Sequence, residues 1–193
     1  MPSLLPTVLE TPRLRLCAPQ PGDGAEVNAA VRETFCVLSR WMRWADHVPD
    51  ILETEQRVCG AAAQFEAGTD YTFYARLKET GVFVAAVGLH GRDPEVPSWE
   101  VGYWQRNGYT GQGYVTEAVS EVTRSAINRI GARRVEIRCD PRNEKSRAVA
   151  ERCGYQLEGR LRDEQIAPDG SLRDTLIFSL LAREYPPLPR SRS

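Results

Sequence analysis

The chain has 193 residues, of which 41% are hydrophobic and 26% charged, as in an ordinary globular domain. Its 25 Lys and Arg residues nearly balance 26 Asp and Glu residues, which argues against a dedicated nucleic-acid-binding protein. The five cysteines form no C-x-x-C pair, so we expect no metal site, no disulfide framework and a reducing, cytoplasmic location. Residues 1–9 do not resemble a signal peptide, and no apolar run approaches the ~20 residues of a membrane span, so no membrane partner is expected.

The first third of the chain is predicted to form one strand and two helices. Polar and apolar residues alternate over 13–18, as in a half-buried strand. Proline and glycine residues then interrupt the pattern, and helices are predicted over 25–45 and 53–67. Asp50 or Thr54 is expected to cap the second helix.

Three strands are predicted to follow. Residues 71–78 are rich in aromatic side chains, and 82–90 are almost entirely apolar, which is typical of a central strand buried on both faces. In the third strand, 98–105, alternation places residues 99, 101 and 103 on one face and residues 100, 102 and 104 on the other.

The clearest helix is predicted over 113–130, where apolar residues form one stripe and charged residues lie elsewhere. Gly131 is expected to end this helix. Residues 133–139 then alternate cleanly and predict another strand.

The last elements are a short helix and two long strands. The helix is predicted over 143–153, with Asn143 as its N-cap and Gly154 just beyond its end. Strands are predicted at 155–165 and 172–181, and an Asp-Gly pair between them predicts a hairpin.

This order of elements predicts an α/β domain with one mixed sheet. No internal repeat or long linker divides it, so residues 1–193 are expected to form a single domain. Its core is expected at about 11–184, and residues 186–193 are expected to be a frayed tail.

A glycine-rich loop precedes the strongest helix. Gly108, Gly111 and Gly113 permit positive φ angles and close approach of a ligand to the backbone. The unpaired N–H groups and the dipole at a helix start favour an anion such as a pyrophosphate. The loop lacks the Gly-Lys-Ser/Thr of a Walker motif, and it comes too late in the chain for a Rossmann fingerprint.

Several segments, in order and at compatible spacing, carry a resemblance to a known family over about residues 11–184. They are Glu10-Thr-Pro-Arg-Leu-Arg-Leu16, Leu38-Ser-Arg-Trp-Met-Arg-Trp44, Glu100-Val-Gly-Tyr-Trp104, Gly111-Gln-Gly-Tyr-Val-Thr-Glu-Ala118, Asn143-Glu-Lys-Ser146, Cys153-Gly-Tyr155 and Leu157-Glu-Gly-Arg160. The chain thereby resembles the GCN5-related N-acetyltransferase (GNAT) superfamily, and within it the RimJ/RimL-like branch of ribosomal-protein N-terminal acetyltransferases.

The resemblance implies a GNAT fold, with a mixed, mostly antiparallel central sheet flanked by helices. The sheet would splay between the fourth and fifth predicted strands, 98–105 and 133–139. It also implies that acetyl-CoA is the cosubstrate and that no metal is needed. The residues implied to bind it are Val101, Gly102 and Tyr103 along the pantetheine, Gly108, Tyr109, Thr110, Gly111, Gln112 and Gly113 around the pyrophosphate, and Asn143 and Ser146.

One departure from the family loop concerns Gly108. The family usually carries Gln or Arg at this place, so a side-chain contact with the pyrophosphate is missing. Arg106 is a candidate to replace it.

The resemblance also implies catalytic residues. Many family members carry a Tyr acid at the position of Ala150, whereas the RimJ/RimL-like branch carries the equivalents of Asn143 and Ser146. Ser146 would then protonate the thiolate of coenzyme A. The structural alternative is that Asn143 only caps the helix and that Ser146 is a solvent-exposed residue of its first turn.

The base that removes the proton of the amine has several candidates. Glu164 is nearest to the family's position on the strand 155–165, but Asp163 or Gln165 could occupy that place. Glu100 is a second candidate, on the splayed strand. No role is assigned to His47 or His90, which are isolated in the sequence.

The expected function is acetyl transfer from acetyl-CoA to a primary amine, most naturally the α-amine of a peptide or protein N-terminus. Trp41 and Trp44 are expected on the acceptor side, with ordinary core packing as the alternative. Two further readings stay open: an acetyltransferase for a small amine (a polyamine, an antibiotic or an amino acid), and a non-catalytic acyl-CoA-binding module. A homodimer is implied by the resemblance, and direct nucleic-acid binding is not expected.

Overall fold

The computed structural model describes residues 4–93 and 95–185; the predicted tail, 186–193, lies outside the described residues. The elements are β1 (Val8–Glu10), β2 (Leu14–Cys17), α1 (Gly24–Trp41), α2 (Ile51–Ala67), β3 (Asp70–Leu77), β4 (Phe83–Asp93), β5 (Ser98–Gln105), α3 (Tyr114–Arg129), β6 (Arg134–Cys139), α4 (Glu144–Arg152), β7 (Gln156–Ile166), β8 (Leu172–Leu181) and a 3-10 turn at Ala182–Glu184. In the described part of the chain, no helix is both long and apolar enough to cross a membrane.

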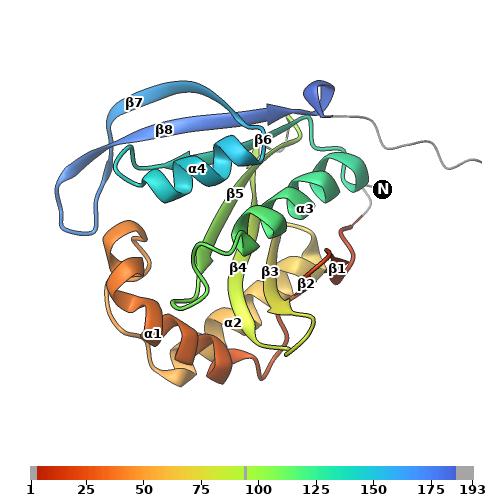
Figure 1. Ribbon diagram of the computed structural model, residues 1–193, viewed down its shortest axis with the longest axis vertical. Coiled ribbons are helices and arrows are strands. Elements are labelled where there is room, and N and C mark those ends of the chain that lie inside the picture. The colour runs from red at the N-terminus through yellow and green to blue at the C-terminus, as the bar shows by residue number, and fades with distance from the viewer. Residues whose placement is uncertain (1–3, 94, 186–193) are drawn as a thin grey trace, which may run out of the picture.

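All strands belong to one sheet in the order β1-β2-β3-β4-β5-β6-β8-β7 (Figure 1). Only β5 and β6 are parallel among the described strands; the other neighbours are antiparallel. The predicted mixed, mostly antiparallel α/β sheet is therefore confirmed. The three-residue strand β1 was not predicted, because so short an edge strand carries too little alternation to be recognised.

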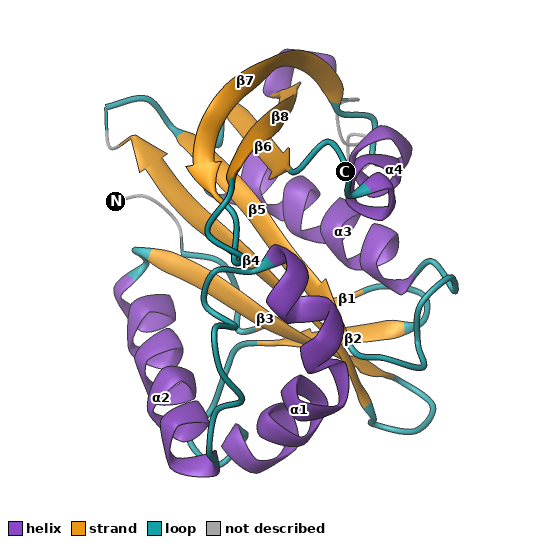
Figure 2. Ribbon diagram, turned by 90° about the vertical axis from the view of Figure 1, so that its left-hand side faces the viewer, coloured by secondary structure: helices purple, strands orange, loops and turns teal. Residues whose placement is uncertain are grey.

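Helices cover both faces of the sheet (Figure 2). On one face, apolar residues of α3 pack on β4 and β5 in a core that includes Val87, Val101 and Val119. On the other face, α1 and α2 pack over a second cluster that includes Phe83 and Ala86. Glu100, Gly102 and Trp104 share this second face with Ala86 and Gly88, so the predicted alternation of the strand is confirmed.

The first helix is shorter than predicted, and the expectation that it reaches residue 45 was wrong. It ends at Trp41, and Met42 is extended, with φ −106° and ψ 115°. The chain turns there because Ala45 is buried and Trp44 packs on Trp104, with 6.4 Å between ring centroids. These contacts are tertiary, and they override a helical pattern that local sequence alone supports.

The sheet opens between β5 and β6, which confirms the predicted splay. The two strands pair at only three positions, from Ser98–Arg134 to Glu100–Glu136. Beyond Glu100, β5 continues to pair with β4 along its other edge. The residues 101–105 therefore present one strand edge without a strand partner in the described chain.

Candidate active site

The glycine-rich loop has the backbone conformation that its sequence predicts. Gly108, Gly111 and Gly113 have φ angles of 84°, 80° and 80°, which residues with a Cβ rarely adopt. Gly113 is the N-cap of α3, so the free N–H groups of the first helical turn face the space beside the loop. A cavity of about 830 Å³ lies there, lined by Gly111, Gly113, Lys145 and Arg152 among others. The lining also includes Glu117 and Glu144, so the free N–H groups of the helix start, and not a net positive charge, favour an anion here.

A further cation, Arg13, contacts the glycine-rich loop. Its Nη1 donates to the backbone oxygen of Gln112 at 2.9 Å, and its Nε donates to Glu117 at 2.7 Å. Arg106 pairs with Glu33 of α1 at 2.8 Å and lies over the ring of Tyr109 in the loop, 5.9 Å from its centroid. Both arginines therefore contact the loop; the sequence analysis missed Arg13 because it lies about 100 residues earlier in the chain.

The start of α4 lies opposite the open edge of β5. The Asn143 side chain accepts a hydrogen bond from the Ser146 N–H at 3.1 Å, so its predicted role as N-cap is confirmed. The Ser146 hydroxyl lies 2.8 Å from the hydroxyl of Tyr103, which also donates to the Ser146 backbone oxygen at 3.1 Å. Burial raises the pKa of Tyr103, so its phenol stays protonated near neutral pH. The two hydroxyls form a protonated pair that spans the opening between β5 and α4.

A second cavity, of about 480 Å³, lies on the far side of this pair. It is lined by residues from α1, β3, β4, β5, β6, α4, β7, β8 and the adjoining loops: Trp41, Met42, Arg43, Trp44, Thr72, Ala86, Gly88, His90, Glu100, Val101, Gly102, Tyr103, Trp104, Arg138, Cys139, Asp140, Asn143, Ser146, Gln165, Arg173 and Thr175. Both predicted acceptor-side tryptophans are among them. A smaller cavity shares Tyr103 and Ser146 with this one and Thr110 and Lys145 with the cavity beside the loop. These adjoining cavities therefore form a row from the glycine loop, past Ser146, to the 480 Å³ cavity, and we call this row the groove.

The candidate carboxylates differ in whether they line this cavity. Glu100 lines the 480 Å³ cavity, and burial raises the pKa of its carboxyl group. Glu164 instead binds Arg138 at 2.7 Å and Thr175 at 2.7 Å, behind the cavity wall. Gln165 lines the cavity but accepts a hydrogen bond from Arg173, and it has no basic group. Glu100 is thus the predicted carboxylate that the fold brings directly to the cavity.

Asp163 is exposed and lies outside this arrangement. Its φ of 48° marks an irregular point in β7, and its N–H donates to Asp174.

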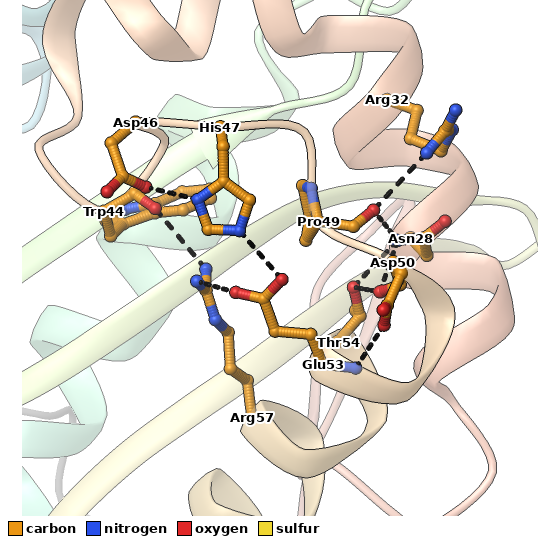
Figure 3. Close-up of polar contacts among 10 residues, drawn as sticks. All are labelled: Asn28, Arg32, Trp44, Asp46, His47, Pro49, Asp50, Glu53, Thr54 and Arg57. Atoms are coloured by element: carbon orange, nitrogen blue, oxygen red, sulfur yellow. Dashed lines mark hydrogen bonds and ion pairs between the residues drawn. The ribbon is translucent and has the colours of Figure 1, made fainter.

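The loop between α1 and α2, which carries Trp44, is held by polar contacts (Figure 3). The Asn28 amide donates to the backbone oxygens of Pro49 and Asp50 at 2.9 and 3.0 Å. Asp50 in turn caps α2 by accepting from the Glu53 N–H. This wall of the cavity is therefore fixed to the helices on both sides.

Comparison with known proteins agrees with these features. Residues 13–156 match the family described as the acetyltransferase (GNAT) domain. The chain is 35% identical over 166 residues to YdaF of Bacillus subtilis (strain 168), which carries a provisional name as a ribosomal N-acetyltransferase; the match covers 86% of this chain and 90% of YdaF. It is 24% identical over 141 residues to a ribosomal-protein-serine acetyltransferase of Escherichia coli (strain K12), covering 71% of this chain and 78% of that protein.

Among solved structures, the fold is similar to that of RimL, a ribosomal α-N-protein acetyltransferase in complex with coenzyme A. The TM-score is 0.84 at 20% identity, over 94% of this chain and 99% of that one.

Proposed function

Because the chain belongs to the GNAT family of acetyl-CoA-dependent N-acetyltransferases, we propose that its acceptor is the α-amine of a peptide or protein N-terminus, as in a ribosomal protein. The names of the relatives YdaF and the ribosomal-protein-serine acetyltransferase support this acceptor. A cytoplasmic location belongs to the same proposal. Homodimer formation, implied by the family resemblance, stays a prediction.

The observation that carries the choice of acceptor is the charge of the 480 Å³ cavity. Its lining includes three arginines, Arg43, Arg138 and Arg173, but only two carboxylates, Glu100 and Asp140. Asp140 is paired with Arg142 at 2.7 Å, Arg138 with Glu164 at 2.7 Å and Glu100 with Arg92 at 3.1 Å. Among the ion pairs of the described residues, none neutralises Arg43 or Arg173, so the cavity is basic. A polyamine carries several positive charges and would need an acidic cavity, whereas a peptide N-terminus brings one ammonium group followed by backbone carbonyls that arginines can bind.

The cofactor would occupy the continuous groove. Its pyrophosphate would bind at the N–H groups of the loop around Gly111 and Gly113, beside Arg13. Its pantetheine arm would lie along the unpaired edge of β5 at Val101, Gly102 and Tyr103. A backbone N–H of this edge would then donate to the thioester oxygen and stabilise the charge that develops there.

The acetyl group would thus lie between Tyr103–Ser146 and the acceptor cavity. The neutral amine attacks the thioester carbon, and the thiolate that leaves takes a proton from Ser146, with Tyr103 as its hydrogen-bonded partner. Glu100 is positioned to attract the ammonium group of the acceptor. An α-amine has a pKa of about 7.7–8.0, against about 10.4 for lysine, so its deprotonation needs only a weak base.

The test is an acceptor panel measured by thiol release and intact mass. The panel holds peptide amides that differ only in the first residue, the same peptides with a blocked α-amine, and spermidine. We expect acetylation of the free α-amine and none of the blocked peptides. Acetylation of spermidine alone would show a small-amine enzyme, and binding of coenzyme A without transfer to any amine would show a non-catalytic module.

A further inference from the structure

Three ionisable side chains form a row across the sheet, and two of them, His90 and Glu100, line the acceptor cavity. In the β-ladder, His90 of β4 pairs with Asp70 of β3 on one side and with Glu100 of β5 on the other. Directly paired residues project to the same face of a sheet. In the adjacent row on that face, Thr72, Gly88 and Gly102 are paired in turn, so the positions on β4 and β5 carry no side chain.

The imidazole of His90 has one orientation fixed by its partner. Nδ1 lies 2.5 Å from the Asp70 carboxylate, which must accept the proton of Nδ1. Nε2 is then the nitrogen with a free lone pair in the neutral ring. A carboxylate that orients a histidine in this way selects which nitrogen can take a proton.

The free nitrogen lies in the gap that the glycines leave. A Cβ atom added to Gly88 would lie 2.6 Å from Nε2, and one added to Gly102 would lie 3.3 Å from it. Gly102 is the middle residue of the β5 segment that would hold the thioester. The basic nitrogen of His90 is therefore beside the proposed reaction centre, and its ring lines the 480 Å³ cavity.

The charged groups around His90 come from four strands. Asp70 of β3 and Glu100 of β5 are negative; Arg92 of β4 binds Glu100 at 3.1 Å, and Arg138 of β6 also lines the cavity. The bond to Asp70, with the nearby Glu100 charge, raises the pKa of His90 from 6.5 although burial opposes this. A base works best when its pKa is near the working pH, and this shift moves histidine in that direction.

We propose that His90, oriented by Asp70, accepts the proton of the acceptor ammonium at Nε2. The assignment rests on the acetyl transfer proposed above, and it leaves Glu100 the role of attracting the ammonium group. R–NH₃⁺ gives one proton to neutral His90, and the freed lone pair forms the C–N bond with the thioester carbon. The C–S bond then breaks, the second amine proton is lost as the thiolate is protonated, and one proton remains on the amide. His90 returns its proton to solvent, so the sum is R–NH₃⁺ plus acetyl-CoA giving the amide, coenzyme A and H⁺.

The orientation of the His90 ring can be tested without any acceptor. The chain has two histidines, so replacing His47 leaves the signal of His90 alone. In the His47→Gln protein, nitrogen NMR reports His90 alone. We expect the neutral ring to carry its proton on Nδ1 and to titrate above 6.5, and Asp70→Asn to lower this pKa. A neutral ring protonated on Nε2, or a pKa unchanged by Asp70→Asn, would overturn the proposal.

The role in the reaction is tested by pH profiles of kcat/KM with a serine-starting peptide amide, or with whichever amine the panel identifies. Activity should rise with pH through the measured pKa of His90, because only the neutral ring accepts a proton. His90→Gln should lower kcat by about 10²-fold and move the rise from the pKa of His90 to that of the amine itself, which is about 7.7–8.0 for an α-amine. Gly88→Ala, which displaces the ring and removes no ionisable group, should do the same.

Two controls separate the alternatives. His47→Gln removes a histidine that also contacts carboxylates and should keep the rise with pH. Glu100→Gln should mainly raise KM. A His90→Gln enzyme whose rise with pH stays at the same pH as in the wild type, and that loses less than tenfold in kcat, refutes the base role while acetyl transfer stands. Failure of every amine to be acetylated refutes the proposed function and the base role together, whatever the NMR result.

Discussion

The Ser146→Ala variant tests whether the hydroxyl group in the first turn of α4 has a catalytic or only a structural role. The substitution deletes the 2.8 Å contact with the Tyr103 hydroxyl. Tyr103 retains its 3.1 Å hydrogen bond to the backbone oxygen of residue 146, and the Asn143 cap is a backbone contact that also remains. The loss of one hydrogen bond costs about 0.5–1.5 kcal/mol. In a domain of this size, that lowers Tm by roughly 2–4 °C per kcal/mol.

The kinetic effect should be much larger than the effect on stability. If Ser146 protonates the departing thiolate, its loss should lower kcat by about 10²–10⁴-fold. The affinity for coenzyme A should change little, because the proposed cofactor contacts are mainly with the backbone. Thiol release gives kcat, calorimetry gives the affinity for coenzyme A, and the melting temperature is measured on the same preparation.

Tyr103→Phe is the matched control, because it deletes the other half of the same hydroxyl pair. If the tyrosine supplies the proton through Ser146, the double variant should be no slower than Ser146→Ala alone. A folded Ser146→Ala enzyme with near wild-type kcat would refute the reasoning and leave solvent as the proton source.

Three further predictions concern the loop, metals and acid stability. Gly111→Val and Gly113→Val should each weaken coenzyme A binding strongly in calorimetry, because both positions have φ near 80°; normal binding by both variants would place the pyrophosphate elsewhere. Activity should be unchanged by a chelator, and its loss with EDTA, restored by a divalent cation, would contradict a metal-free mechanism. Arg134 lowers the pKa of Glu158 to about 2 from 4.5, so this ion pair stabilises the fold above pH 4.5, and its contribution is lost as the pH falls through 2. Glu158→Gln should therefore lower the free energy of unfolding, measured by urea denaturation, by less than ~1 kcal/mol at pH 7 for so exposed a pair, and not at pH 2. An equal loss at both pH values would rule out the ion pair as its cause.

Local sequence predicted most of the fold because its signals are local. The strand at 98–105 and the helix caps at Asn143 and Asp50 depend on alternation and on side chains within a few residues of one another. The end of α1 could not be predicted in this way. Ala45 and Trp44 leave the helix for partners elsewhere in the chain, and no short-range pattern records them.

The site residues likewise fall into those that local sequence identifies and those that it does not. Gly111, Gly113 and the pair Asn143–Ser146 could be identified from short motifs. Asp70 and His90, however, are 20 residues apart, and only the register of β3 and β4 brings them together. The sequence contained a signal for this pair, because two predicted neighbouring strands joined by a short turn constrain the register. A slip of one residue in that register, however, would have placed the two side chains on opposite faces of the sheet.

A pantetheine arm bound along β5 would extend the short ladder between β5 and β6, and so would link acetyl-CoA binding to the stability of the fold. Three residue pairs join these strands, and a pantetheine arm laid along β5 would provide the neighbour that the rest of this edge lacks. A ligand that binds only the folded protein stabilises it by about 2.7 kcal/mol at a free concentration 100 times its Kd. Acetyl-CoA, as such a ligand, would therefore stabilise the splayed sheet as well as serve as the cosubstrate.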